Sequence, residues 1–363
     1  MASATAAPVP AARLVSLDAF RGLTIASMIL VNNPGTWSAM YWPLGHAPWH
    51  GWTPTDLIFP FFLFMVGMSM NYSRKTSFRE ALRRSAVLFG LGVFMAAYPF
   101  FDLTTVRIPG VLQRIALCYL AAWVVRRTFG VVGQTLTCGA MLAVYWLLMT
   151  RVPVPGGLAP NLDPSTNLSA WLDRLLMDGH LWRQSKTWDP EGLLSTLPAI
   201  GTTLLGVLAG EWLRTKRTPR AKVVGLLAAG LVLTLAGLAW HESFPINKNI
   251  WTSSYVLFTG GMAAYLFAVT YLLADVYGVR GWTRPWVVYG TNAIFVFVAS
   301  GLVAKTLGIV KLGGTSLQVL LYQGLFAWWL SPVNASLAYA VVNIGLWYLA
   351  LLWMDRRGIH LKV

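Results

Sequence analysis

The sequence predicts an all-α membrane protein, a polytopic bundle of about ten transmembrane helices with one further helix at the outer interface. Three observations lead to this fold class. Of the 363 residues, 56% are hydrophobic and 11% are charged, and the mean hydropathy is +0.58. The apolar residues form runs of about membrane-spanning length, and Lys and Arg gather between alternate runs. So few charges could not cover the apolar surface in water, and the lipid bilayer is the expected solvent.

Ten apolar runs are long enough to be interpreted as membrane spans. They are residues 17–31, 56–70, 81–100, 108–125, 131–149, 193–213, 223–240, 251–273, 286–306 and 335–354. No repeat or low-complexity linker divides them. We therefore expect one membrane domain over residues 13–363, preceded by a disordered cytoplasmic tail over residues 1–12.

The positive charges predict how this bundle is oriented. A basic cluster follows every second run, and Lys and Arg are enriched on the cytoplasmic side of membranes. The clusters are Arg74, Lys75, Arg79, Arg83 and Arg84; Arg126 and Arg127; Arg214, Lys216, Arg217, Arg220 and Lys222; Arg280 and Arg284; and Arg356 and Arg357. Ten spans with both termini in the cytoplasm satisfy all of them. The net charge of +15 therefore reflects topology, and no nucleic-acid partner is expected.

One apolar segment is not interpreted as a span. Residues 316–330 read SLQVLLYQGLFAWWL and are followed by Ser331 and Pro332. A span at this point would move Arg356 and Arg357 to the outer side. The segment is therefore predicted to be a helix in the outer interface, where tryptophan is enriched.

The first outer loop carries the strongest candidates for chemistry. It reads NNPGTWSAMYWPLGHAPWHGWTPTDLIFPFFLF and places His46, His50 and Asp56 where the chain re-enters the membrane. Two imidazoles and a carboxylate at a bilayer edge can supply a general base. Alternatively, His50 is an interfacial anchor and Asp56 caps the second helix. No third ligand stands at a recognisable spacing, and Cys118 and Cys138 lie inside apolar runs, so no metal site or disulfide is expected.

An arginine in the middle of an apolar run is costly unless it faces a partner, a polar cavity or an anionic ligand. Arg114 has this position, in RIPGVLQRIALCYL. With Arg107 and Gln113 it could present planar donors to phosphate or carboxylate groups. The alternative is an ion pair with another helix, for which Asp18 and Asp56 are candidates.

Polar residues also gather in the later outer loops. Asp189 and Glu191 stand at the outer start of the sixth run, where they can bind sugar hydroxyls or an amine, or only favour the helix dipole. Asn292, in YGTNAIFVF, is a buried amide that can join helices, and Asp18 and Arg21 are spaced to pair on one helical face. The loop FPINKNIWTSSY holds a set suited to carbohydrate or to an interfacial collar: Asn247, Lys248, Asn249 and Trp251.

Five separated motifs resemble, in this order, the membrane domain of the heparan-α-glucosaminide N-acetyltransferase family, whose bacterial branch is linked to N-acetylglucosamine use. They read SLDAFRGLTIASMILVNNPG, HAPWHGWTPTDLIFPFFLFMVG, RIPGVLQRIA, DPEGLLSTLPAIGTTLLG and FPINKNIWTSSYVLFTGG. The resemblance implies transfer of an acetyl group from cytoplasmic acetyl-CoA, as co-substrate, to an amino sugar or glycan end across the membrane. It also implies the inner membrane of a bacterium, with a periplasmic acceptor.

The resemblance also implies roles for individual residues. The histidine of the first outer loop is the catalytic residue proposed in that family, and His46 in GHAPWHGW matches it. The asparagine of the VNN turn lines the reaction centre, and Asn32 matches it, with Asn33 adjacent. His50 is an accessory candidate.

The expected mechanism is direct transfer, in which His46 takes the proton of the attacking amine, Asn32 stabilises the oxyanion and Asp56 completes the catalytic set. Acetylation of His46 before the sugar arrives is the second form of this hypothesis. The residues expected to bind CoA are Arg114, Gln113, Arg107, Asn292 and Arg21. Those expected to bind the sugar are Asn33, His50, Asp189, Glu191, Asn247, Lys248, Asn249 and Trp251.

Two other classes of function remain open. A transporter of N-acetylglucosamine or related cell-wall sugars would also need polar loops and a membrane-embedded arginine such as Arg114. A structural membrane scaffold would need neither acetyl-CoA nor His46. A homodimer is a further expectation, because small residues such as Gly260 and Gly261 can pack between helices.

Overall fold

The computed structural model describes residues 14–73 and 77–361. The tail at residues 1–12, predicted to be disordered, lies outside the described residues, as do Arg74 and Lys75 of the first basic cluster. Within the described chain the fold is mostly helical, with long loops and one hairpin of two short strands, β1 (Lys311–Leu312) and β2 (Thr315–Ser316). The predicted all-α class is confirmed.

The helices follow the predicted apolar runs. In chain order they are α1 (Val15–Asn32), α2 (Ile58–Met70), α3 (Phe78–Ala97), α4 (Val111–Thr128), α5 (Val131–Arg151), α6 (Leu168–Met177), α7 (Thr196–Arg214), α8 (Pro219–His241), α9 (Ser253–Tyr271), α10 (Arg284–Thr291), α11 (Ala293–Ile309), α12 (Leu317–Tyr322) and α13 (Pro332–Arg356). Short 3₁₀ or π turns are η1 (Trp42–Leu44), η2 (Pro54–Leu57), η3 (Leu272–Val276), η4 (Gly281–Thr283) and η5 (Gln323–Ala327).

Six of the described helices are long and apolar enough to cross a membrane: α1, α5, α7, α8, α9 continued through η3, and α13. A seventh span results if α10 and α11, which meet at a bend of 70°, count as one broken span. Four charged residues stand among the first seven of α3, α4 contains three arginines, and α2 has only 13 residues. The chain is a multi-pass membrane protein, but the predicted count of ten spans is not confirmed.

Small residues allow the central helices to pack with their backbones close together. A Cβ added to Gly67 of α2 would lie 1.9 Å from the carbonyl oxygen of Thr203 in α7, and one on Gly206 would lie equally close to Phe64. Gly261, expected to serve a dimer, packs instead within the chain, where an added Cβ would lie 2.3 Å from Thr234 Oγ1. The homodimer stays a prediction that this glycine does not support.

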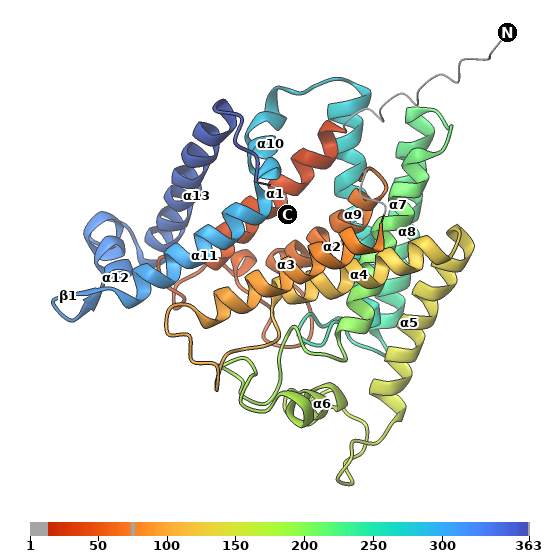
Figure 1. Ribbon diagram of the computed structural model, residues 1–363, viewed down its shortest axis with the longest axis horizontal. Coiled ribbons are helices and arrows are strands. Elements are labelled where there is room, and N and C mark those ends of the chain that lie inside the picture. The colour runs from red at the N-terminus through yellow and green to blue at the C-terminus, as the bar shows by residue number, and fades with distance from the viewer. Residues whose placement is uncertain (1–13, 74–76, 362–363) are drawn as a thin grey trace.

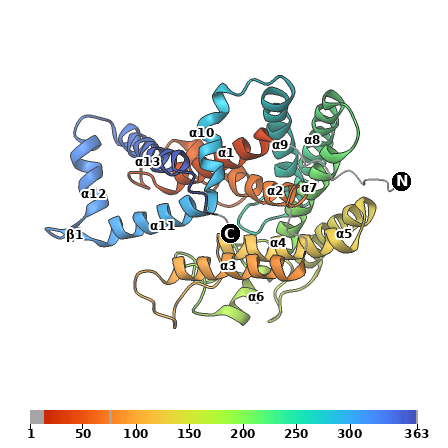
Figure 2. The same cartoon turned by 45° about the horizontal axis from the view of Figure 1, so that its top comes forward.

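The two ends of the molecule differ in their connections. Figure 1 shows α6 and the long loop around it at the bottom of the view, while the α7–α8 and α9–α10 connections lie at the top. We call the latter the basic end, because residues 214–222 and 280–284 carry its Lys and Arg, and the former the long-loop end. Figures 1 and 2 both place α11, α12 and α13 on one side of the molecule, away from α5, α7 and α8.

The segment 316–330 is helical, as predicted, and is formed by α12 and η5. Trp328 and Trp329 at its end are 75% and 57% exposed. Exposed indoles of this kind suit a lipid interface.

Candidate active site

The first outer loop folds back so that Asp56 reaches His46. Asp56 lies in η2, just before α2, and is 1% exposed. One of its carboxylate oxygens accepts hydrogen bonds from the backbone amides of Ala47 and Thr53, each 3.0 Å long, and from the hydroxyl of Thr53. The other lies 2.7 Å from Nδ1 of His46. Asp56 therefore caps the turn before α2 and also orients the imidazole.

The electrostatics of this pair favour an ionised Asp56. Burial works to raise the pKa of Asp56, but the hydrogen bond from His46, the charge of Lys248 and the amide of Ala47 outweigh it and hold that pKa at about 2. The tautomer of His46 that donates its Nδ1 proton to Asp56 leaves the lone pair of Nε2 free. Because 47% of the His46 side chain is exposed, this lone pair is available as a base.

Lys248 completes the cluster from the α8–α9 loop. Its Nζ lies 3.3 Å from Asp56 Oδ1, and 2.9 and 3.3 Å from the two ring nitrogens of His46. Burial lowers the pKa of Lys248, and the charges of Asp56 and Glu191 oppose that shift. Lys248 balances the charge of Asp56 and lies within hydrogen-bond distance of both ring nitrogens of His46.

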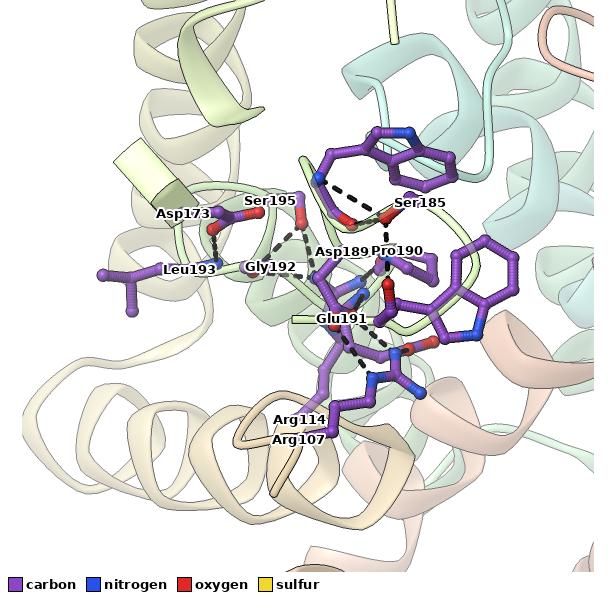
Figure 3. A network of polar contacts seen from close by, with 12 residues as sticks. Arg107, Arg114, Asp173, Ser185, Asp189, Pro190, Glu191, Gly192, Leu193 and Ser195 are labelled. Carbon is purple, nitrogen blue, oxygen red and sulfur yellow. Dashed lines mark hydrogen bonds and ion pairs between the residues drawn. The ribbon is translucent and has the colours of Figure 1, made fainter. Parts of the chain in front are cut away.

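A second cluster joins three predicted site residues to one another. Arg107 donates from Nε and Nη2 to the two oxygens of Asp189, at 2.8 and 2.5 Å, and from Nη2 to Glu191 at 2.5 Å. Figure 3 shows Arg107, Arg114 and Asp173 converging on the turn of residues 189–195. The side chain of Asp189 is fully buried, so its predicted contact with a sugar is replaced by a structural ion pair with Arg107.

Arg114 binds the same turn through its carbonyl groups. It is 1% exposed and donates to the backbone oxygens of Pro190, at 2.8 Å, and Gly192, at 2.9 Å, and to Ser195 Oγ, at 2.5 Å. The alternative interpretation, an ion pair with Asp18 or Asp56, is wrong, because Arg114 donates to these three oxygens. The guanidinium instead joins α4 to the start of α7 through Nη1 and Nη2, and its Nε is buried with no hydrogen-bond partner among the described residues.

Several predicted sugar contacts are part of the fold instead. Trp251 is 1% exposed, donates from its indole to Thr202, and lies with its ring 5.1 Å below the guanidinium of Arg114. Asn247 is fully buried and accepts from the amide of Ile250. Both residues therefore support the loop that carries Lys248, and neither reaches the surface.

Of the other predicted residues in these loops, one is buried and the rest are exposed or partly exposed. Asn33 is 7% exposed and donates to the carbonyl of Ile29, which closes the end of α1. His50 is exposed, with Nδ1 3.3 Å from the amide nitrogen of Asn247, and Asn249 is partly exposed. Asn32 is exposed and lines a cavity near α13.

Asn292 joins helices, as the alternative interpretation had it. It is fully buried at the α10–α11 bend, where its amide donates to the carbonyl of Ile359 and accepts from the amide of Leu361. Its own side chain therefore positions the C-terminal segment.

A cavity of about 530 Å³ lies at the basic end and is called the basic-end cavity. Arg21 and Arg84 line it. Arg21 donates to Asp18 at 3.3 Å and to Ser69 at 3.0 Å. Arg84 packs over the ring of Tyr119, and its Nε is buried with no hydrogen-bond partner within residues 14–73 and 77–361. A buried, unpaired guanidinium donor favours an anionic ligand.

A second cavity of about 800 Å³ lies at the long-loop end and is called the long-loop cavity. Its lining includes three basic residues, Arg107, Arg183 and Lys305, and the carboxylate of Asp102. Gln113, which is 4% exposed, also lines it. A Cβ added to Gly92 would lie 2.1 Å from Gln113 Oε1, so this glycine makes room for the amide.

These two cavities follow the same three helices. On each helix a residue that lines one cavity stands three or four positions from a residue that lines the other: Leu88 and Gly92 on α3, Ile115 and Leu112 on α4, and Ile294 and Phe297 on α11. Such residues are neighbours on one face of a helix, about one turn apart. The cavities therefore lie end to end, separated by about one helical turn.

Three residues were missed in the sequence: Arg84 and Lys305, which line these two cavities, and Asn343, which lines the cavity near α13. Arg84 was interpreted only as a marker of the cytoplasmic side, because it stands in a basic cluster. Lys305 lies inside the ninth predicted run and Asn343 inside the tenth. Arg114 was chosen as a candidate because it is a polar residue within an apolar run. The same criterion would have identified Lys305 and Asn343.

Asp173 of α6 is expected to make stability depend on pH. It is 1% exposed, one of its oxygens accepts from the amide of Leu193, and the other has no partner in the described chain. Burial raises the pKa of Asp173 to about 6; the charge of Asp189 adds to this shift and that of Arg114 opposes it. This folded-state pKa exceeds the unfolded value of about 4. Protonation of Asp173 therefore stabilises the folded protein below about pH 4, and this stabilisation is lost as the pH rises through 6.

An Asp173→Asn variant avoids this loss. Its stability relative to wild type should increase by about 1 kcal/mol between pH 5 and pH 8, since one pKa unit corresponds to about 1.4 kcal/mol. Thermal unfolding in detergent across this pH range measures the difference. A constant difference between the two proteins would show that Asp173 does not titrate in the folded state.

Comparison with known proteins adds an independent finding. The sequence profile described as heparan-alpha-glucosaminide N-acetyltransferase, catalytic, matches residues 13–246. The heparan-alpha-glucosaminide N-acetyltransferase of Homo sapiens is 30% identical over 79% of this chain and 52% of its own length, and that of Mus musculus is 29% identical over 79% and 53%. The chain thus spans about half the length of these curated relatives. The matched range of this chain includes His46, Asp56 and Arg84.

Proposed function

The chain belongs to the heparan-α-glucosaminide N-acetyltransferase family, and we propose that it transfers the acetyl group of acetyl-CoA to the amine of an amino sugar. The basic end would face the cytoplasm of a bacterium and receive acetyl-CoA, and the long-loop end would face the periplasm and receive the sugar. The observation that carries this proposal is the His46–Asp56 pair, in which a buried carboxylate orients a half-exposed imidazole.

In this proposal His46 acts as the general base. Asp56 accepts the Nδ1 proton, and Nε2 takes a proton from the amine as its nitrogen attacks the carbonyl carbon. Asp56 then stabilises the imidazolium, while the nearby charge of Lys248 favours return of that proton to the leaving thiolate. Asn32 would donate its amide to the carbonyl oxygen that becomes negative.

The two end-to-end cavities support a route for acetyl-CoA along α3, α4 and α11. Arg84 offers a buried guanidinium donor to phosphate at the basic end, beside Arg21. Gln113 stands at the junction, where a long acyl-carrying arm would have to pass. Asp18 partly offsets the charge of Arg21, so Arg84 is the group best placed to bind a phosphate of the nucleotide.

Replacing Arg84 with methionine is expected to raise KM for acetyl-CoA by about tenfold or more, because a hydrogen bond to a charged group contributes about 1.5–3 kcal/mol. KM for the amino sugar should not change. The matched control is Arg83→Met, since Arg83 is adjacent, exposed and outside the cavity lining. Equal effects of the two substitutions in steady-state kinetics would contradict a specific phosphate contact at Arg84.

The function itself is tested with purified protein in liposomes, supplied with labelled acetyl-CoA and glucosamine. We expect N-acetylated sugar only when both substrates are present. Accumulation of unmodified sugar without acetyl-CoA would overturn the proposal in favour of a transporter. A labelled acetyl group trapped on His46 before sugar is added would identify the two-step form of the reaction.

A further inference from the structure

A third cavity, of about 200 Å³, lies where the end of α1 meets α11, α12 and α13. We call it the α13 cavity. Its lining is polar and aromatic, and combines the amides of Asn32, Gln318 and Asn343 with the ammonium group of Lys305 and the rings of Trp37 and Tyr339. Such a lining is unusual where α11 and α13 are otherwise apolar helices.

Asn343 gives this cavity an unsatisfied acceptor. Its Oδ1 is buried and has no hydrogen-bond partner in the part of the chain that the structure describes. Asn343 lies on α13, which is long enough to span a membrane. An unpaired buried acceptor costs about 1–3 kcal/mol, and polar groups at this depth mark functional positions. A ligand that donates a hydrogen bond would remove this cost.

The walls of the α13 cavity are held in place by hydrogen bonds that do not involve Asn343. The backbone amide of Gly35 donates to the carbonyl of Ser336, and Thr36 exchanges two hydrogen bonds with the Ser336 hydroxyl, at 3.1 and 3.0 Å. Tyr41 donates to Asn334 at 2.6 Å. The segment that follows α1 is therefore fixed to α13, and the cavity is formed before any ligand binds.

Lys305 connects the α13 cavity with the long-loop cavity, because its side chain lines both. It donates to the carbonyls of Met95 and Tyr98 at the end of α3. A ligand in the α13 cavity would therefore lie next to the outer end of the proposed acetyl-CoA route, beside Asn32.

We propose that the α13 cavity binds the ring of the acceptor amino sugar, which deepens the proposed function and rests on it. Its volume lies below the roughly 300–1,000 Å³ of sites for drug-sized ligands, and so suits a single sugar ring. The amide oxygens accept from ring hydroxyls, Lys305 donates to one, and Trp37, 64% exposed, can pack against the apolar face of the ring. The charge of Lys305 also favours the neutral amine, the form that attacks the thioester.

The test is Asn343→Leu, measured against both substrates. KM for glucosamine should rise about tenfold, while KM for acetyl-CoA stays unchanged. The substitution removes a buried unpaired acceptor, so the melting temperature should be equal or higher. The matched control is Gln134→Leu, because Gln134 Oε1 is also buried without a partner in the described chain, but lies on α5 outside this lining. The same KM for glucosamine in both variants would overturn the proposal.

Binding without acetyl-CoA separates this inference from the proposed function. Saturation-transfer NMR with glucosamine and N-acetylglucosamine reports sugar contact whether or not chemistry occurs. If wild type binds these sugars, Asn343→Leu does not, and no acetyl transfer is seen, the sugar site is supported and the acetyltransferase proposal fails. If acetyl transfer occurs but Asn343→Leu and Trp37→Ala bind sugar like wild type, the site is overturned and the activity stands.

Discussion

Replacing His46 with alanine is expected to lower kcat for acetyl transfer by about 10²- to 10⁴-fold, the usual contribution of a positioned general base. KM for acetyl-CoA should change little, because His46 lies in the outer loop and does not line either cavity of the proposed CoA route. Radiolabelled acetyl transfer to glucosamine under saturating conditions measures the effect. The variant should fold normally, since the His46 side chain is 47% exposed.

Two further measurements make this result specific to the imidazole. Added imidazole should restore part of the activity of His46→Ala. The matched control is His180→Ala, since His180 also lies at the long-loop end but its ring contacts the carbonyl of Val106. Activity of His46→Ala within a few-fold of wild type would remove His46 from the chemistry, whatever the control shows.

Replacing Arg114 with methionine is expected to cost about 3–5 kcal/mol of stability. The substitution removes the arginine donor from the carbonyl of Pro190 and the hydroxyl of Ser195, whereas the carbonyl of Gly192 still accepts from the hydroxyls of Ser195 and Thr196. It also removes the cation from the face of Trp251. In detergent, at a fixed heating rate, the melting temperature should fall by about 5–10 °C.

The control for Arg114 lies on the same helix. Arg127 is exposed and packs over the ring of Trp123 at the surface, so Arg127→Met should change the melting temperature by no more than about 1 °C. Equal losses in the two variants would contradict the structural role of Arg114. Normal stability of Arg114→Met with weaker acetyl-CoA binding would restore the role predicted from the sequence, that of a donor to the ligand.

Nearly all the helices could be located from the sequence, because charged and proline-rich segments mark the two ends of the apolar runs. The sequence did not reveal that residues 286–306, predicted as one span, are bent. The chain breaks there at Asn292, whose φ of −119° and ψ of 34° are not helical, and α10 and α11 meet at 70°. Because the residues on both sides are apolar, hydropathy does not detect such a break. The amide of Asn292 stabilises it by binding Ile359 and Leu361.

The site was predictable where its parts are close in sequence. His46 and Asp56 are ten residues apart. The capping interpretation of Asp56 is confirmed by the hydrogen bond from Thr53, and its contact with His46 is the one that the catalytic interpretation requires. Lys248, some 200 residues further on, reaches them only through the packing of the α8–α9 loop. The partners of Arg114 were missed for another reason. They are mainly backbone carbonyls, which every residue has, so no side chain in the sequence points to them.

The single turn between the basic-end and long-loop cavities has a consequence for the energetics of the cell. Apart from Gln113, the residues that face each other across it are apolar: Leu88, Gly92, Leu112, Ile115, Ile294 and Phe297. A narrow apolar constriction is dewetted and resists the passage of ions. A flexible acyl chain can slide through such a layer, whereas hydrated protons cannot. If acetyl-CoA follows the proposed route, this turn would let the protein bind substrates on both sides of the membrane without dissipating the proton gradient.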